Sequence, residues 1–376
     1  MKDFFFPLLL VLLASVFQGT FGLGMKYVKP LAWEAWWLVH ATVAMLLLPW
    51  LWAFLVVPGL VQVLTDAPAG PLGQGALYGF LWGIGGIMFG VSVRYVGMSL
   101  TYGIVMGLAA LMGSLIPLLG LENIGANPVL PYVLGGMAAL LVGVGIVAYV
   151  GIKRDGILAA EGKQIQGVQS GSAFRVGLII AVTCGVLSGL LNVGFSATAP
   201  IGAVAEKAGT ITRNTALARW VVVLVGAYAM NAGYALFLLV KNGTFVSFRV
   251  KGGFAAYKWA VIAGLLWFAA LGVYGQGAAL MGDLGPVIGW PMLLGLALII
   301  SSALGVWTGE WKGAPGPFKT MLGGIVVLII AICVLGYSNR LKPQLHSQPT
   351  PAQTSATSNG DAFEITRCVT AFQPSL

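Results

Sequence analysis

Two ionisable side chains stand at or inside a long apolar stretch of the sequence. Glu34 opens this stretch, and His40 lies about one helical turn inside it. A charged side chain at the centre of a membrane helix costs about 2.5–3.5 kcal/mol on insertion scales, so ionisable groups found there are candidates for function. An imidazole can take up a proton near physiological pH. We interpret Glu34 and His40 as candidate proton-coupling groups; the alternatives are an interfacial carboxylate and a packed, hydrogen-bonded histidine.

Uncharged polar and aromatic side chains recur in the apolar stretches. A carboxamide offers both hydrogen-bond donors and acceptors, as a neutral sugar requires, and aromatic rings offer flat apolar faces for the C–H surfaces of the sugar. The alternative is that the amides join helices to one another and that the rings form a belt at the membrane interface. The predicted substrate-binding residues are Gln18, Trp82, Asn192, Tyr228, Asn231, Trp267, Tyr274 and Gln276.

The composition indicates which class of protein carries these residues. Of the 376 residues, 58% are hydrophobic and 8% are charged, whereas about 25% of an average soluble domain is charged. The net charge of +9 lies largely in short loops, which favours lipid headgroups over nucleic acid as the partner. Neither a Ser-His-Asp pattern in a plausible context nor an HExxH motif nor a P-loop is present. The sequence therefore predicts no enzyme, no catalytic residue, no cofactor and no metal site.

Ten apolar runs are long enough to cross a bilayer, which takes about 20 residues. Transmembrane β-strands would instead form alternating segments of about ten residues. The sequence therefore predicts an all-α membrane protein with ten transmembrane helices. The predicted spans lie near residues 4–24, 36–57, 74–92, 96–118, 130–151, 175–196, 216–240, 259–280, 286–307 and 318–337.

The longest internal polar stretch, residues 152–174, predicts a cytoplasmic linker between two halves, 1–151 and 175–337. Each half holds five spans, and because five is odd, halves of one fold must enter the membrane in opposite orientations. This is the inverted-repeat arrangement of many secondary transporters, with the substrate site at the midplane between the repeats. Residues 338–376 are rich in Pro, Gln, Ser and Thr, which predicts a disordered tail.

Basic residues predict the orientation in the membrane. Most of the 20 Lys and Arg residues follow the first, third, fifth, seventh and ninth spans. These loops should face the cytoplasm, which leaves both termini on the outer side. We expect Arg219, at the outer end of the seventh span, to extend to the surface.

Glycine pairs four residues apart predict close contacts between helices, because the lack of a side chain lets two backbones approach. Three such pairs lie within the spans: Gly86 with Gly90, Gly103 with Gly107, and Gly185 with Gly189.

The chain resembles the bacterial L-rhamnose–proton symporters of the drug/metabolite transporter superfamily. The likeness covers residues 14 to 337 and is carried by QGTFGLGMKYVKPLAWEAWWLV at 18–39, LWGIGGIMFG at 81–90, RYVGMSL at 94–100, CGVLSG at 184–189 and GEWKGA at 309–314. The resemblance implies ten helices in two inverted five-helix repeats. It also implies proton-driven sugar uptake across the inner membrane.

From the residues and the resemblance together we expect a secondary active transporter that takes up L-rhamnose or a related neutral sugar with protons. One alternative is an exporter or exchanger of another small metabolite on the same fold. The other is a membrane protein that senses or assembles without transporting. Polar residues within the spans argue against a purely structural bundle, which has little reason to keep them.

Overall fold

The computed structural model describes residues 2–121, 124–160, 171–309, 311 and 314–341. Every regular element in this part of the chain is helical. A bilayer demands this, because an α-helix satisfies its backbone hydrogen bonds within one segment. The predicted tail lies outside the described residues from position 342 onward. The middle of the predicted linker, 161–170, also lies outside them.

The described part of the chain contains ten helical stretches long and apolar enough to cross a membrane, which confirms the predicted all-α class and number of spans. These stretches are Phe5–Met25, Trp33–Val56, Ala69–Val96, Ser99–Leu119, Leu130–Ile157, Gly171–Lys207, Thr212–Asn242, Phe254–Leu280, Gly282–Trp307 and Pro315–Leu341.

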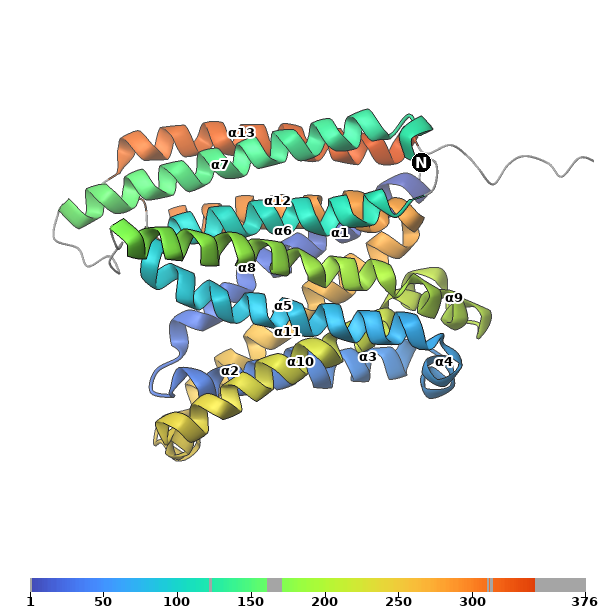
Figure 1. Cartoon of the computed structure of the whole chain (residues 1–376), viewed down its shortest axis with the longest axis horizontal. Coiled ribbons are helices and arrows are strands. Elements are labelled where there is room, and N and C mark those ends of the chain that lie inside the picture. Colours follow the sequence, from blue (N-terminus) through green and yellow to red (C-terminus); the bar gives the residue numbers. More distant parts are fainter. Residues whose placement is uncertain (1, 122–123, 161–170, 310, 312–313, 342–376) are drawn as a thin grey trace, which may run out of the picture. The chain divides into compact units, whose positions relative to one another are not determined.

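Twelve α-helices build these stretches, and a further short helix, α4, lies between the second and the third stretch (Figure 1). In the first half they are α1 Lys2–Thr20, α2 Trp33–Ala41, α3 Leu48–Val56, α4 Leu60–Asp66, α5 Ala69–Val96, α6 Met98–Leu119 and α7 Leu130–Ala160. In the second half they are α8 Gly171–Ala197, α9 Ala199–Lys207, α10 Thr215–Asn242, α11 Phe254–Leu280, α12 Gly285–Trp307 and α13 Pro315–Ser338. Short 3-10 segments adjoin them: η1 Phe21–Tyr27, η3 Ile124–Ala126, η4 Thr212–Asn214, η5 Thr244–Arg249, η6 Gly282–Leu284 and η7 Asn339–Leu341.

The second span is one helical stretch with an irregular turn. Between α2 and α3 the residues Thr42–Leu47 form a π-helical segment, η2. A π-turn is wider than an α-turn and is found frequently at functional sites. The wide turn begins two residues after His40, so it sits directly beside one of the candidate proton-coupling groups.

Left-handed glycines set two of the turns between spans. Gly97 separates α5 from α6 with φ 83°, and Gly243 ends α10 with φ 65°. Residues with a Cβ rarely adopt these angles, whereas glycine does so readily. Both turns lie at the same end of the helices as η5 and the break between α7 and α8. We name this the linker end, and we name the opposite end, with α4, α9 and η6, the α9 end (Figure 1).

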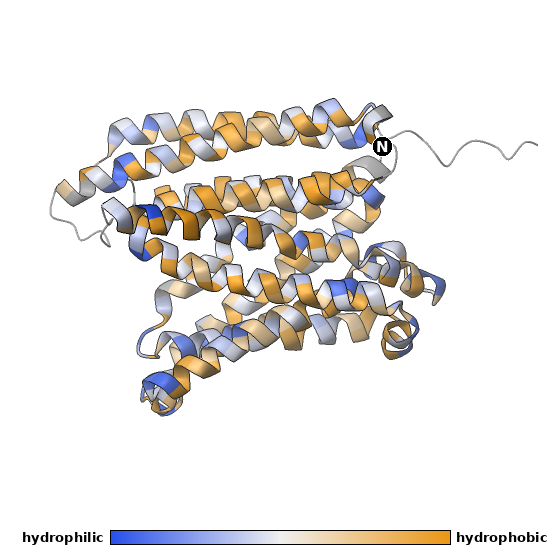
Figure 2. Ribbon diagram, in the orientation of Figure 1, coloured by the Kyte–Doolittle hydropathy of each residue, from blue (hydrophilic) through white to orange (hydrophobic). Residues whose placement is uncertain are grey.

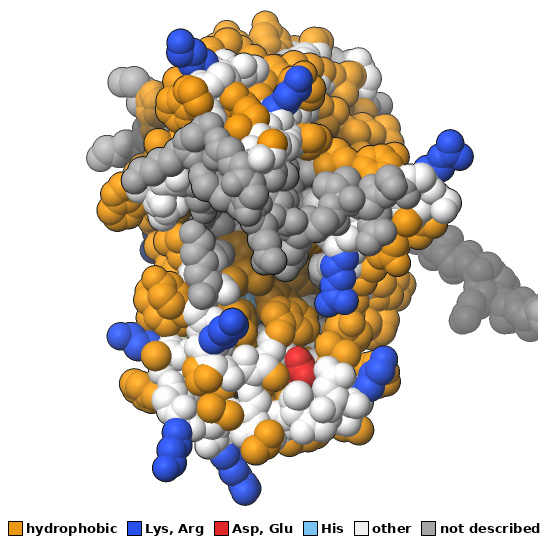
Figure 3. All heavy atoms as spheres, turned by 90° about the vertical axis from the view of Figure 1, so that its left-hand side faces the viewer, with side chains coloured by type: hydrophobic (Ala, Val, Ile, Leu, Met, Phe, Trp, Pro, Cys, Tyr) orange, Lys and Arg blue, Asp and Glu red, His pale blue; other side chains and the backbone are white. Residues whose placement is uncertain are grey.

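Hydrophilic residues lie mainly toward the two ends of the helices, and hydrophobic residues dominate their middles (Figure 2). Seen from the linker end, the described surface is hollowed, with apolar walls inside the hollow and Lys and Arg side chains around it (Figure 3). This distribution matches helices that cross an apolar layer between two aqueous faces.

Small residues determine how closely the helices pack. At Gly79 of α5 an added Cβ would fall on the carbonyl of Val223 in α10, and at Gly226 of α10 it would fall on the carbonyl of Ala76 in α5. The two backbones therefore touch, and neither glycine has room for a side chain.

The glycine pairs predicted from the sequence have different outcomes. Gly185 and Gly189 of α8 lie directly against α6, as predicted, and Gly103 of α6 lies against Ala148 of α7. The prediction for Gly86 and Gly90 is wrong. A Cβ at either position would meet nothing within 4 Å, because both face away from the neighbouring helices.

Candidate functional site

Five helices that pack together carry polar and aromatic side chains near the middle of the spans. We name them the central cluster: Gln18 of α1, Trp37 and His40 of α2, Trp82 of α5, Tyr228 and Asn231 of α10, and Trp267 of α11. The packing of α2 against both α10 and α11, and of α5 against α10, brings these helices together.

A hydrogen bond between Trp37 and Asn231 joins the two halves of the chain. The indole Nε1 of Trp37 donates to Oδ1 of Asn231 at 3.1 Å, and Nδ2 of Asn231 donates to the carbonyl of Ala227 at 2.9 Å. Asn231 is 2% exposed. Nearby, the hydroxyls of Thr42 and Tyr228 lie 3.4 Å apart.

Indole rings supply apolar faces on the opposite side of the cluster. The rings of Trp82 and Trp267 lie with their centroids 5.5 Å apart at an interplanar angle of 34°. Gly83, next to Trp82, lets α5 approach Asn231, because an added Cβ would stand 3.1 Å from Nδ2 of that amide and 2.7 Å from Cβ of Met230. The absence of a side chain at Gly83 therefore lets the backbone of α5 pack directly against Asn231 of α10.

His40 is almost fully enclosed by other rings. Its side chain is 1% exposed, and its ring centroid lies 5.4 Å from that of Trp36 and 5.0 Å from that of Trp37. Phe21 stacks on it from the end of the first span. Nδ1 of His40 is buried and has no hydrogen-bond partner in the described part of the chain. A neutral imidazole in this state offers a free lone pair, which can accept a proton or a hydroxyl hydrogen.

Gln18 presents a second buried acceptor, its Oε1, which has no hydrogen-bond partner among the described residues. Gly24 lies against Ala263, and Gly277 lies against Pro7, so the first span and α11 run antiparallel. This register places Gln18 level with Trp267. Buried polar atoms are normally hydrogen-bonded, so unpartnered acceptors beside a hollow are where a polar ligand gains most.

Asn192 and Tyr274 belong to a different group of residues. In this group, both polar atoms of the Asn192 amide already have hydrogen-bond partners. Nδ2 of Asn192 donates to the carbonyls of Gly113 and Pro286 at 2.7 and 2.9 Å, and the hydroxyl of Tyr274 donates to Oδ1 at 2.6 Å. Asn192 and Tyr274 are both 0% exposed. We name these four residues the closed network; it ties α8 to α6, α11 and α12 toward the α9 end.

Aromatic packing surrounds the closed network. The ring of Trp290 meets that of Tyr274 edge-on at 5.5 Å, and its Nε1 donates to the carbonyl of Ala109 at 3.0 Å. Phe195 stacks on Trp220 with the centroids 4.5 Å apart. The closed network and these rings leave no exposed polar atom for a substrate in this arrangement.

The expectation that Arg219 extends to the surface is wrong. Its side chain is 8% exposed, its guanidinium donates to the carbonyl of Phe195 through both Nε and an Nη, and it lies 3.7 Å from the centroid of the Phe195 ring. A guanidinium spreads its charge and pairs well with a carbonyl and an aromatic face, so it tolerates this burial. Arg219 thereby holds the end of α8 against α10.

Gln276 also lies apart from the central cluster, at the α9 end. Its Nε2 donates to Oδ1 of Asn214 at 3.0 Å, which ties α11 to the segment before α10. Of the eight predicted substrate-binding residues, the structure thus brings five together in the central cluster. It places Asn192 and Tyr274 in the closed network and Gln276 near the surface.

Glu34 is buried at the linker end, 6% exposed. Its Oε1 accepts hydrogen bonds from Nδ2 of Asn242 at 3.0 Å and from the hydroxyl of Thr244 at 2.6 Å. These donors are neutral and come from the last residue of α10 and the first residue of η5. The carboxylate therefore joins the start of α2 to the end of α10, about one and a half helical turns from His40.

Trp37 is the member of the central cluster that the sequence analysis did not single out. The sequence could have indicated Trp37, because it is an aromatic residue three positions before His40 and therefore lies on the same face of the helix. What the sequence lacks is the rotation of α2 about its axis. That rotation is set by contacts with α10 and α11, which are distant in the sequence.

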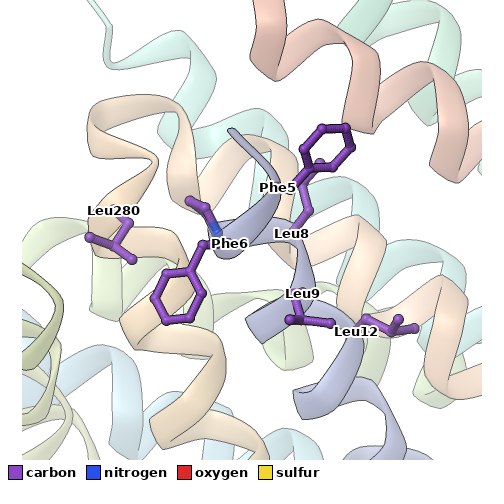
Figure 4. Close-up of a pocket in the computed structure, with 7 residues that line it drawn as sticks. Phe5, Phe6, Leu8, Leu9, Leu12 and Leu280 are labelled. Atoms are coloured by element: carbon purple, nitrogen blue, oxygen red, sulfur yellow. The ribbon is translucent and has the colours of Figure 1, made fainter. Parts of the chain in front are cut away.

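A separate pocket of about 750 Å³ lies along the first half of α1 (Figure 4). Its lining residues are Phe5, Phe6, Pro7, Leu8, Leu9, Leu12 and Leu280. These side chains are apolar and several are exposed, as lipid-facing residues are. The pocket offers a sugar no side-chain hydrogen bond. Elsewhere, no group of three or more His, Cys, Asp or Glu residues with metal-binding geometry occurs among the described residues.

In the described part of the chain, ten helical stretches long enough to span a membrane, with a central cluster of indoles, amides and one imidazole, define a polytopic membrane protein. Comparison with known proteins makes the class specific. The profile of the family described as L-rhamnose-proton symport protein (RhaT) matches residues 4–339, and the chain belongs to this family.

Individual relatives agree with the family. The chain is 27% identical over 335 residues to the L-rhamnose-proton symporter of Yersinia pestis (strain Pestoides F), with 86% of this chain and 93% of the relative covered. The L-rhamnose-proton symporter of Yersinia pseudotuberculosis serotype O:1b (strain IP 31758) matches with the same identity and coverage.

Proposed function

We propose that the protein is a secondary transporter that carries L-rhamnose, or a closely related neutral sugar, together with protons across the bacterial inner membrane. The observation that carries this proposal is the central cluster. It combines indole faces, a buried amide and unpartnered acceptors on helices from both halves of the chain. The names of the family and of the relatives supply the substrate and the coupling ion.

The chemistry of the central cluster suits a neutral sugar. Trp82 and Trp267 offer flat apolar surfaces to the C–H faces of the ring. Oε1 of Gln18 accepts from a sugar hydroxyl, and the Trp37–Asn231 pair exchanges its mutual hydrogen bond for bonds to the sugar. The cluster contains no permanently charged side chain, so no uncompensated charge is buried when the sugar enters.

The packing of the helices supports two inverted five-helix repeats, 1–151 and 175–337. In the first repeat α1 packs against α11 and α12 of the second. Its counterpart α8 packs in the same way against α5 and α6 of the first. α6 contacts its counterpart α12, and α7 contacts its counterpart α13. A two-fold relation between the halves accounts for all of these contacts, with the central cluster near its axis.

We assign the linker end to the cytoplasm, which places both termini in the periplasm. This follows the excess of Lys and Arg in the loops at the linker end. With this orientation the hollow in Figure 3 opens to the cytoplasm, and the closed network seals the periplasmic side. The structure then corresponds to the state that releases sugar into the cell.

Glu34 and His40 are the proposed proton-coupling groups, in different roles. His40 touches the central cluster and has a free acceptor, so a proton there changes the charge beside the sugar. Glu34 bonds to the end of α10 and the start of η5, so its protonation weakens a contact that holds α2 and α10 together at the linker end.

Uptake of labelled L-rhamnose into membrane vesicles that contain this protein tests the proposal. We expect accumulation when the outside is more acidic than the inside, and loss of accumulation when a protonophore is added. Flux that ignores the proton gradient would overturn the coupling. Flux of another solute that rhamnose does not inhibit would overturn the substrate and favour an exporter or exchanger.

A further inference from the structure

Three buried polar atoms in the contact between α2 and α11 have no hydrogen-bond partner among the residues that the structure describes. They are Nε1 of Trp36, Nδ1 of His40 and the hydroxyl of Tyr257. Trp36 is 0% exposed and packs with Ala256 and Ala260 of α11, and Tyr257 borders the same group of side chains. An unpartnered buried polar group costs about 1–3 kcal/mol, so three in one contact require an explanation.

The register between the two helices places these atoms in order. Gly264 lies against Val43 and the carbonyl of His40, and Gly272 lies against Trp52, so the second span and α11 run parallel. Tyr257, seven residues before Gly264, therefore falls level with Trp36. The backbone of Ala260 lies beside the imidazole of His40, which agrees with this register.

The rings of Trp36 and His40 stack with their centroids 5.4 Å apart at an interplanar angle of 8°, and the ring of Tyr257 stacks on that of Phe248. Water molecules bridge polar groups that do not reach one another directly. Buried water typically joins polar groups that would otherwise be unsatisfied, which is the situation of these three atoms.

We propose that buried water in the contact between α2 and α11 joins His40, Trp36 and Tyr257 into a proton path that is separate from the path of the sugar. We name this contact the α2–α11 seam. The inference rests on the proposed function, since it specifies how the coupled proton leaves. It assigns a role to Tyr257, which lies outside the central cluster.

The three groups differ in what they can do along the seam. The imidazolium of His40 gives its Nδ1 proton to the adjacent water and becomes neutral again. An indole N–H only donates, so Trp36 holds a water by its oxygen and orients it. A phenol both accepts and donates, so the hydroxyl of Tyr257 takes a proton from the water while it passes its own proton onward. Tyr257 stands in the first turn of α11, and the path therefore ends at the linker end.

Other titratable groups near His40 in the described part of the chain are engaged or turned outward. Glu34, on the same helix, is bonded to Asn242 and Thr244. Tyr228 of α10 is bonded to Thr42, Tyr27 of η1 stacks on Trp259, and Lys258 of α11 is exposed. Within the seam itself, His40 and Tyr257 are the groups that can carry a proton.

The test uses the full chain in proteoliposomes and separates sugar movement from proton movement. Counterflow of labelled L-rhamnose at equal pH reports the sugar path alone. Accumulation under an inward proton gradient and an internal pH dye report the proton. In Tyr257→Phe we expect counterflow close to wild type and a proton-driven rate of about one tenth, since a positioned proton-transfer group contributes at least that much. Tyr234→Phe, which removes a hydroxyl on α10 beside Phe237, is the matched control and should change neither quantity.

Two results would overturn the inference. One is proton-driven accumulation in Tyr257→Phe equal to that of wild type. The other is loss of counterflow in step with accumulation, which would mean that the hydroxyl acts on the sugar or on the fold. If Tyr257→Phe does not fold into the membrane, Trp36→Phe takes its place in the same test, because it removes the indole N–H that orients a water molecule.

A structural measurement keeps the inference separate from the proposed function. No rhamnose counterflow in wild type would contradict the substrate assignment, whatever happens in the variants. Density maps at a resolution that shows water should reveal ordered water between Tyr257 and His40, for any substrate. A dry seam in such a map would overturn the proton path even if rhamnose is transported.

Discussion

Oδ1 of Asn231 accepts a hydrogen bond from Trp37 in the other half of the chain, and Nδ2 of Asn231 donates one to the carbonyl of Ala227 in its own helix. In the proposed function, the bond to Trp37 is the one that a sugar replaces. Asn192 has the same side chain, but backbone carbonyls and a buried tyrosine already bond to its donors and its acceptor. The neighbours of the two asparagines, and not their type, therefore predict different roles for them.

Replacing Asn231 by Leu should weaken sugar binding. The change removes one hydrogen bond to the sugar and leaves the indole N–H of Trp37 unpaired, which costs about 1–3 kcal/mol and corresponds to a KM raised about tenfold or more. The measurement is the concentration dependence of rhamnose uptake. Gln74→Leu, on the exposed start of α5, is the control and should keep the KM of wild type. An unchanged KM in Asn231→Leu would remove Asn231 from the site.

Replacing Asn192 by Leu should lower stability instead. The change removes the hydrogen bonds that Asn192 makes with the carbonyls of Gly113 and Pro286 and with the hydroxyl of Tyr274. Each buried group left unsatisfied costs about 1–3 kcal/mol, so we expect a clearly lower Tm for the purified protein in detergent. The KM of the protein that remains folded should stay near wild type. A raised KM at unchanged Tm would contradict the structural role and return Asn192 to the sugar site.

At the scale of helices, the ten spans could be predicted because a bilayer imposes length and hydropathy on any helix that crosses it. The irregular turn η2 could not, since Thr42–Leu47 is as apolar as a regular helix and its widening depends on contacts with α10 and α11. For the same reason, the sequence predicted only some members of the central cluster. Residue type marked Gln18, Trp82 and Asn231 as polar or aromatic, but the faces of Trp37 and Gln276 depend on helix rotation, which only packing determines.

Two glycines on the helices α10 and α5 should respond differently to replacement by alanine, because only one of them lies in the contact between these helices. Gly226→Ala places a Cβ on the carbonyl of Ala76, and the helices must separate, so the yield of folded protein and its Tm should fall. Gly86→Ala adds the same methyl group where nothing lies within 4 Å, and its Tm should match wild type. Equal stability of the two variants, measured side by side in detergent, would show that the helices are not in backbone contact.

For the whole molecule, one end of the described bundle is closed and the other is hollowed. An alternating-access transporter is expected to have such a difference in each of its end states. The α9 end is closed by the Asn192 network and by Arg219 on Phe195. The linker end is hollowed and carries exposed basic residues (Figure 3). With the proposed topology, we expect sugar to leave through the linker end, and we expect the closed network to break before sugar enters at the α9 end.

Labelling of single cysteines tests which end faces the cytoplasm. With the native cysteines replaced by alanine, Lys207→Cys at the α9 end should react with a membrane-impermeant thiol reagent on cells whose outer membrane is permeable to it. Lys251→Cys at the linker end should react only after the inner membrane is opened. Both lysines are exposed in the structure, so burial does not bias the comparison. The reverse labelling pattern would invert the proposed topology.

The most direct test of the central claim, that sugar and proton move through one protein by way of the central cluster, is the internal pH of proteoliposomes after L-rhamnose is added outside. No proton gradient is imposed at the start, and the membrane potential is clamped. Wild type should acidify its interior as sugar enters, and Asn231→Leu should do so only at correspondingly higher sugar concentration. Sugar entry without any change of internal pH, or equal responses of wild type and Asn231→Leu at all concentrations, would contradict the account.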